Sequence, residues 1–261
     1  MKLCFSTLGC ADKSLEDIMA LAAKYDIPAL EIRGIGGVLN NAEIEVFSDA
    51  MAKTTQQTIS DGGIVLQVLG TSCTFHNPDK YDASVTEGRE AVRIAERFGI
   101  PSIRVFGDKA TRGSTERIIS GISELCSLSN SVCILLEVHG DYNTVQTLLP
   151  VIKGLGDRKN FGLIWDIEHT HKPYGDRWEE FYTEFRPYIK HVHIKDYSDT
   201  DKCLTLIGQG DIPIIPILRK LKDNGYNGYI SLEWEKKWHP ELPEIENALE
   251  SFLKLAKEGE I

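Results

Sequence analysis

Four short apolar runs in the second half of the chain each carry a side chain that can bind a metal or transfer a proton. They are Glu137 in "LLEVH", Asp166 in "IWDIEH", His193 in "HVHIKD" and Glu233 in "SLEWE". Three carboxylates and one imidazole make an oxygen-rich donor set, which suits Mn²⁺ or Mg²⁺ and also tolerates Zn²⁺ or Co²⁺. Taken alone, each of these side chains could be an ordinary surface group at the end of a strand. Because buried carboxylates need a cation or strong hydrogen bonds, the four together favour one divalent metal site.

The spacing of these residues indicates a repeated unit. Successive members of the set are 29, 27 and 40 residues apart, about the length of one strand, one helix and two loops. Eight strand-length apolar runs can be marked in the chain, at 3–8, 29–34, 64–70, 102–107, 132–139, 161–169, 191–196 and 229–235. We therefore expect each candidate ligand to lie at the carboxyl end of its own strand.

Segments with helical periodicity separate the runs. Residues 14–25 begin with the capping residue Ser14 and place Leu15, Ile18 and Leu21 on one face. Further helices are expected at 87–98, ended by Gly99, and at 211–225 and 242–258.

Eight strand–helix units in 261 residues are typical of a single-domain (β/α)₈ TIM barrel spanning 1–261. The alternative is an open doubly wound sheet. The first loop, "STLGCADKS", has a single glycine, and "GIGG" at 34–37 lacks the dinucleotide-binding fingerprint. We therefore favour the barrel, whose active sites lie at the carboxyl ends of the strands.

Composition narrows the functional classes. The formal net charge is −10, which disfavours nucleic acid as a partner, and no apolar run is long enough to span a membrane. The start, "MKLCFSTLGC", predicts a first strand rather than a signal peptide. The six cysteines form no C-x-x-C pair, which is typical of free thiols in a reducing cytoplasm.

Several motifs together resemble one known family. "CFSTLGC", "VFGD", the D-x-x-H of Asp166 to His169, "HVHIKD", "GQGDIPI" and "SLEWEKKWHPEL" are similar to the xylose isomerase-like TIM barrels, over nearly the whole chain. That family includes sugar isomerases and epimerases, inosose and dehydroshikimate dehydratases, and endonuclease IV. The resemblance implies that Glu137, Asp166, His193 and Glu233 bind one divalent metal. It also implies that the two glutamates serve as the acid/base pair and that His169 contacts substrate.

The chemistry expected of such a site is proton transfer beside a carbonyl group. It needs a base, an acid and a cation that stabilises the enediolate. We predict a metal-dependent isomerase or epimerase acting on a small sugar, sugar phosphate or polyol, with a dehydratase of the inosose or dehydroshikimate type as the alternative. An endonuclease IV-like enzyme and a non-catalytic sugar-binding barrel are further rivals. The sequence leaves a homo-oligomer open.

Other side chains at the strand ends could bind substrate. Arg33 and Arg104 could hold an anionic group or pair with nearby acids, and Lys195 shares the strand face of His193. His76 could line the pocket or lie free in its loop, and Trp238 could cap the pocket or pack on the last helix.

Three residues close in sequence to the candidate ligands are expected to lie outside the site itself. His191 is expected in the core or in support of the ligands, whereas Glu168 and His171 are expected to face solvent. Cys10 could line the pocket floor. The long connection at 196–213 predicts a mobile lid because of Gly208 and Gly210.

Overall fold

Eight parallel strands close into a barrel in the computed structural model, which describes residues 1–258. Around the barrel the strand order is β1, β10, β7, β6, β5, β4, β3, β2. The strands are β1 (Lys2–Ser6), β2 (Ala29–Ile32), β3 (Val65–Thr74), β4 (Ser102–Phe106), β5 (Cys133–Glu137), β6 (Phe161–Asp166), β7 (Ile189–Ile194) and β10 (Tyr229–Leu232). The predicted TIM barrel fold is confirmed. The last three residues of the predicted 1–261 domain lie outside the described part.

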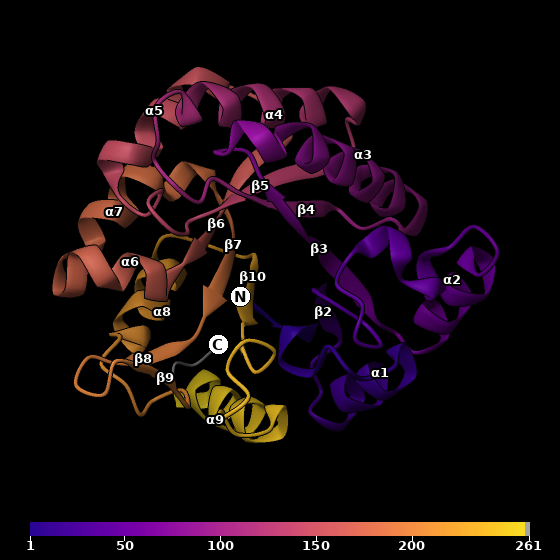
Figure 1. The fold of residues 1–261 in the computed structure, drawn as a ribbon. Coiled ribbons are helices and arrows are strands. Elements are labelled where there is room, and N and C mark those ends of the chain that lie inside the picture. The colour runs from indigo at the N-terminus through magenta and orange to yellow at the C-terminus, as the bar shows by residue number, and fades with distance from the viewer. Residues whose placement is uncertain (259–261) are drawn as a thin grey trace.

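Helices surround the strands on the outside of the barrel (Figure 1). They are α1 (Leu15–Lys24), α2 (Ala52–Asp61), α3 (Tyr81–Phe98), α4 (Ser114–Leu128), α5 (Val145–Leu155), α6 (Ile167–Tyr174), α7 (Trp178–Phe185), α8 (Ile214–Asp223) and α9 (Ile245–Glu258). The barrel closes where β1 pairs with β10, so its first and last strands lie side by side. Nearby, the Tyr25 hydroxyl after α1 donates to Glu250 of α9.

Two of the predicted helix ends agree with the structure, and other predicted ends differ from it. The Ser14 side chain accepts a hydrogen bond from the Asp17 N–H at the start of α1, and Gly99 ends α3 in the left-handed conformation with φ of 66°. Helix α3 begins at Tyr81, earlier than the expected start at residue 87. None of the helices among residues 1–258 combines the length and hydropathy needed to cross a bilayer.

Alternation along the strands decides which side chains reach the barrel interior. Val68, Leu135 and Ile164 pack together in a small inner cluster, whereas Trp165 lies against the ring of Tyr182 in α7, with centroids 5.2 Å apart. Side chains two residues apart on a strand share a face. The residues that follow Leu135 and Ile164 on the inner face are Glu137 and Asp166, so the apolar pattern itself directs both carboxylates inward.

The connection at 196–213 contains a β-hairpin, and its predicted mobility as a lid stays a prediction. Strands β8 (Asp196–Ser198) and β9 (Cys203–Thr205) pair antiparallel. The buried Asp196 carboxylate accepts backbone N–H groups from Gly208, Gly210 and Ile212. A Cβ atom at Gly210 would collide with this carboxylate, so close packing rather than flexibility accounts for that glycine.

Candidate metal centre

The four predicted ligands meet at the carboxyl ends of β5, β6, β7 and β10. One ligand atom from each lies within 4.8 Å of every other, and all four side chains are buried. The Nδ1 atom of His193 is 3.4 Å from Glu233 Oε2, 3.7 Å from Glu137 Oε1 and 3.8 Å from Asp166 Oδ2. Metal–ligand bonds of about 2.0–2.2 Å at tetrahedral angles separate ligand atoms by roughly 3.3–3.6 Å. The spacing therefore fits a single divalent ion after small adjustments.

His193 Nδ1 has the environment of a metal donor, and Asp166 divides its two oxygens between a helix cap and the centre. Within residues 1–258, the buried His193 Nδ1 has no hydrogen-bond partner. Asp166 Oδ2 lies 3.8 Å from that nitrogen and 2.9 Å from Lys195 Nζ, whereas Oδ1 accepts from the backbone N–H groups of Glu168 and His169 at the start of α6. Asp166 is thus both a helix cap and a candidate ligand, and its cap fixes the direction of Oδ2.

Glu31 of β2 is a central residue that the sequence reasoning missed. Its side chain is fully buried, and its Oε2 atom accepts hydrogen bonds from His193 Nε2 at 2.9 Å and His191 Nε2 at 3.2 Å. The expectation that His191 supports the ligands agrees with this contact. An acid on the inner face of an otherwise apolar strand, "ALEI", was the signal available in the sequence.

Two buried cations bind the carboxylates of the centre. Arg104 Nη1 lies 2.9 Å from Glu137 Oε2 and 3.5 Å from Glu233 Oε1, so it pairs with acids, and its contact with substrate stays a prediction. Lys195 Nζ lies 2.9 Å from Asp166 Oδ2 and 2.6 Å from Glu233 Oε2. Burial acts to raise the pKa of the Glu233 carboxyl, but His193 and Lys195 hold this pKa well below its usual value.

The charges around His193 also fit a divalent cation. Four carboxylates lie against its ring, those of Glu31, Glu137, Asp166 and Glu233. Two cationic side chains, Arg104 and Lys195, contact members of this set. Without a metal, burial acts to lower the pKa of the His193 imidazole, but Glu233, Glu31 and Glu137 hold this pKa well above its usual value. A metal-binding His193 must be neutral, and an excess of two negative charges is then left, which is costly in a buried site unless it is compensated. Mn²⁺, Mg²⁺ or Zn²⁺ would provide that compensation.

The residues that follow Asp166 are more buried than expected. Glu168 and His171 were expected to face solvent, but they are 3% and 8% exposed. Glu168 pairs with Lys172 at 2.7 Å, and His171 Nε2 lies 3.0 Å from Asp199 Oδ2 in the β8–β9 hairpin. Both expectations were wrong because α6 lies under the hairpin, which a reading of local pattern does not reveal.

His169 lies beside the centre as a neutral imidazole. Burial lowers its pKa to about 3, and its ring packs against that of His139, with centroids 4.2 Å apart. Its role in substrate contact remains a prediction.

A cavity of about 110 Å³ opens at the barrel mouth above the centre. Predicted substrate residues that line it are Arg33, Arg104, Lys195 and Trp238, together with Glu137 and Glu233. The other lining residues, which the sequence reasoning did not assign to substrate, are Leu8, Phe106, His139 and Glu235. Trp238 is 53% exposed, so it lies at the rim and not beneath the last helix.

His76 lines a different cavity from the other candidates. Its Nδ1 lies 3.5 Å from Asp108 Oδ2, in a hollow of about 650 Å³ that Ser72 also lines. Arg33 connects the two hollows, because its Nη2 donates to Ser72 Oγ at 2.9 Å. The predicted contact of His76 with substrate therefore lacks support from its position.

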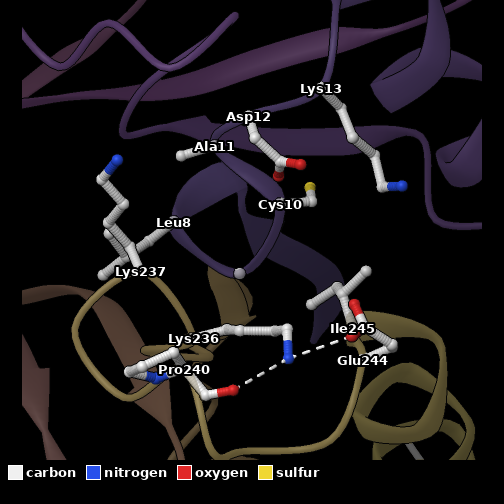
Figure 2. A pocket seen from close by; sticks show the side chains of 11 residues that line it. Leu8, Cys10, Ala11, Asp12, Lys13, Lys236, Lys237, Pro240, Glu244 and Ile245 are labelled. Carbon is white, nitrogen blue, oxygen red and sulfur yellow. Dashed lines mark hydrogen bonds and ion pairs between the residues drawn. The ribbon is translucent and has the colours of Figure 1, made fainter.

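Cys10 likewise lies outside the mouth cavity. Figure 2 shows it in a neighbouring hollow of about 350 Å³, between the loop after β1 and the loop after β10. There Lys236 Nζ pairs with Glu244 Oε1 at 3.0 Å and donates to the Pro240 carbonyl. Burial raises the pKa of the Cys10 thiol to about 12, which disfavours the thiolate form that a nucleophile needs.

Comparisons with known proteins add a family and several relatives. The family model described as "Xylose isomerase-like TIM barrel" matches residues 19–256. An inosose dehydratase from Clostridium perfringens is 28% identical, over 54% of this chain and 52% of its own. An inosose isomerase from Bacillus velezensis is 24% identical, over 99% and 95%. A 3'-dehydrocarminate deglycosidase alpha subunit from a Microbacterium species is 38% identical, over 87% and 84%. The chain spans about a third to a half of the length of the first curated relatives that it matches.

Proposed function

This chain belongs to the xylose isomerase-like TIM barrel family, and from that premise we propose that it is a divalent-metal-dependent lyase of the dehydratase type. It would act on a small polyol or sugar that carries a ketone. The first step removes a proton from the carbon beside the ketone, and the second expels the oxygen substituent on the next carbon. The observation that carries the proposal is the pair of buried glutamates, Glu137 and Glu233, which lie 3.7 Å and 3.4 Å from His193 Nδ1 and line the mouth cavity.

The residues of the mouth have separate tasks in this reaction. Glu233, whose pKa is held low by His193 and Lys195, is ionised and can accept the proton. Glu137 is the second carboxylate and can handle a proton on the other side of the substrate. Arg104 contacts both glutamates and fixes their relative position. A divalent ion held by Glu137, Asp166, His193 and Glu233 would supply positive charge beside the ketone oxygen, where negative charge develops.

Elimination rather than isomerisation is favoured by the relatives and by Lys195. An inosose is a cyclic polyol ketone, and its dehydratase expels water. The name 3'-dehydrocarminate denotes a ketone on the sugar, whose deglycosidase releases the rest of the molecule. Both substrates have a leaving group next to the carbon that loses a proton. Lys195 lines the mouth cavity and is a hydrogen-bond donor for a departing oxygen.

The isomerase or epimerase remains the second candidate. The two glutamates lie 3.7 Å and 3.4 Å from the same nitrogen of His193, an arrangement that also suits exchange of a proton between two faces of a substrate. An inosose isomerase is among the relatives. The non-catalytic rival is disfavoured because it requires one glutamate to be displaced from the mouth, and both line it.

The decisive experiment uses deuterated water. Metal-loaded protein is incubated with a panel of inososes, 3-keto-glycosides and ketoses, and products are followed by mass spectrometry and NMR. We expect metal-dependent incorporation of deuterium together with loss of water or of the aglycone. Deuterium incorporation with all substituents retained would instead assign the isomerase or epimerase. The proposal fails if no substrate of these classes exchanges a proton with loaded enzyme.

A further inference from the structure

The contact between Glu31 and His193 crosses the interior of the barrel. Strand β2 and strand β7 are separated by β1 and β10 in the barrel order, and the two residues are 162 positions apart in the chain. Both side chains have an exposed fraction of 0%. A charged carboxylate at such a depth is expensive unless it has a specific partner. The two imidazoles of His191 and His193 are its hydrogen-bond partners.

The geometry identifies this cluster as hydrogen-bonded rather than as a second metal site. Glu31, His191 and His193 are close enough together to suggest metal binding. However, Glu31 Oε2 lies 2.9 Å and 3.2 Å from the two Nε2 atoms, the ordinary N–H···O range. An ion with bonds of about 2.0–2.2 Å would require a strongly bent arrangement at these distances. It would also make His193 bind metals through both nitrogens.

We propose that Glu31 is a positioning residue for the metal centre: it accepts the Nε2 proton of His193 and so directs the Nδ1 lone pair toward Glu137, Asp166 and Glu233. A neutral imidazole has one protonated nitrogen and one lone pair, and the partner of the protonated nitrogen selects the tautomer. A carboxylate in this position also makes the ligating nitrogen more basic.

His191 completes the arrangement by holding the Glu31 carboxylate. Its Nε2 approaches the same oxygen that His193 uses, and the two rings stand nearly perpendicular at 86°. His191 Nε2 lies 3.2 Å from Glu31 Oε2, within donating distance of that oxygen. In the described part of the chain, Glu31 Oε1 has no hydrogen-bond partner. The orientation of the carboxylate therefore depends on the two imidazoles.

The test compares three variants by their affinity for Zn²⁺, measured by competition with a chelator. Glu31→Leu removes both the charge and the acceptor, whereas Glu31→Gln keeps an acceptor oxygen and removes the charge. Glu168→Gln is the matched control, because it removes a buried negative charge beside Asp166 without touching the hydrogen bonds of His193. Altering a partner of a metal-binding histidine typically weakens metal affinity by about 10- to 100-fold. We expect that loss in Glu31→Leu, a smaller loss in Glu31→Gln and at most a few-fold change in Glu168→Gln.

A spectroscopic readout separates positioning from general stability. Protein labelled with ¹⁵N-histidine and loaded with Zn²⁺ should show a downfield Nε2–H proton of His193, shifted in Glu31→Gln and lost in Glu31→Leu. If Glu31→Leu does not fold, Glu31→Gln decides the question by affinity and proton shift together. Wild-type affinity and an unshifted proton in Glu31→Gln would overturn the inference, as would an equal loss of affinity in Glu168→Gln.

The inference rests on the metal centre of the proposed function, not on the reaction assigned to it. If wild-type protein binds no divalent ion, the proposed function and the inference both fail. If wild-type protein binds Zn²⁺ and the Glu31 variants bind it equally well, only the inference fails.

Discussion

The two halves of the barrel contribute different side chains to the same mouth. Strands β5, β6, β7 and β10 provide all four candidate metal ligands, one from the end of each strand. Strands β1 to β4 provide none of that set. Instead, Glu31 of β2 orients a ligand, Arg104 of β4 pairs with two ligands, and Arg33 after β2 lines the cavity.

The second half of the barrel thus provides the candidate metal ligands, and the first half provides side chains that support those ligands. The ligands of the second half converge because neighbouring parallel strands end at the same rim. In the first half, Glu31 reaches His193 from across the barrel and Arg104 reaches Glu137 from the neighbouring strand, and both balance charge and fix orientation. The second half should therefore dominate turnover and metal binding, whereas the first half should act through stability and geometry.

The largest effect is expected from substituting the two glutamates in the second half of the barrel. Glu137→Gln and Glu233→Gln keep the size of the side chain and one oxygen but remove the base. Turnover should fall by at least the ~10²–10⁴-fold typical of losing a general acid or base. Metal should be retained in part, because Asp166 and His193 remain. Steady-state kinetics and metal content check this together. The control is Glu124→Gln, at a half-buried position on α4 on the outside of the barrel. Full recovery in excess metal would show that the glutamates are ligands only.

A first-half substitution should appear mainly as lost stability. Arg104→Met leaves Glu137 and Glu233 without their shared cation in a buried site, and breaking a buried ion pair costs about 3–5 kcal/mol. The free energy of unfolding from denaturant titration measures this change. Arg89→Met breaks an exposed pair with Glu124 and should cost no more than about 1 kcal/mol. Equal losses in the two variants would contradict the supporting role given to Arg104.

Asp166→Asn should separate the two roles of one ligand. Asparagine also caps helices, so α6 should keep its start and the protein its fold. The loss of charge should weaken metal binding by at least the ~10–100-fold that changing a mere partner of a ligand costs. Activity should return in part with excess Mn²⁺, which a titration of activity against metal concentration would show. Undiminished Mn²⁺ affinity in this variant would remove Asp166 from the ligand set.

The smallest effect is expected at the rim. Trp238 is 53% exposed, so Trp238→Ala should change stability by less than about 0.5 kcal/mol. Because Trp238 lines the mouth cavity, KM should rise, by less than about tenfold if a single ring contact is lost. Val65→Ala is the control, since Val65 is also exposed but begins β3 at the opposite end of the barrel. An unchanged KM in Trp238→Ala would exclude this residue from the substrate site.

The sequence by itself determined the strand–helix repeat and the four candidate ligands. Both are local properties: a strand-length apolar run indicates a strand, and a polar residue near the end of the run marks its carboxyl end. Glu137 and Asp166 were found in this way, and the structure places them on the same strand faces as the buried Leu135 and Ile164. In any closed parallel barrel the strands end at the same rim, so these ligands come close together.

Which side chains from distant parts of the sequence meet was decided only by the tertiary structure. Glu31 reaches His193 across the barrel, Arg104 contacts both Glu137 and Glu233, and His171 is covered by a hairpin through Asp199. His76 lies in a separate hollow although it also follows a strand. The physical reason is that local periodicity fixes which face a side chain takes. The closure and register of the barrel fix what it meets there, and for Glu31 and His193 that partner is 162 residues away.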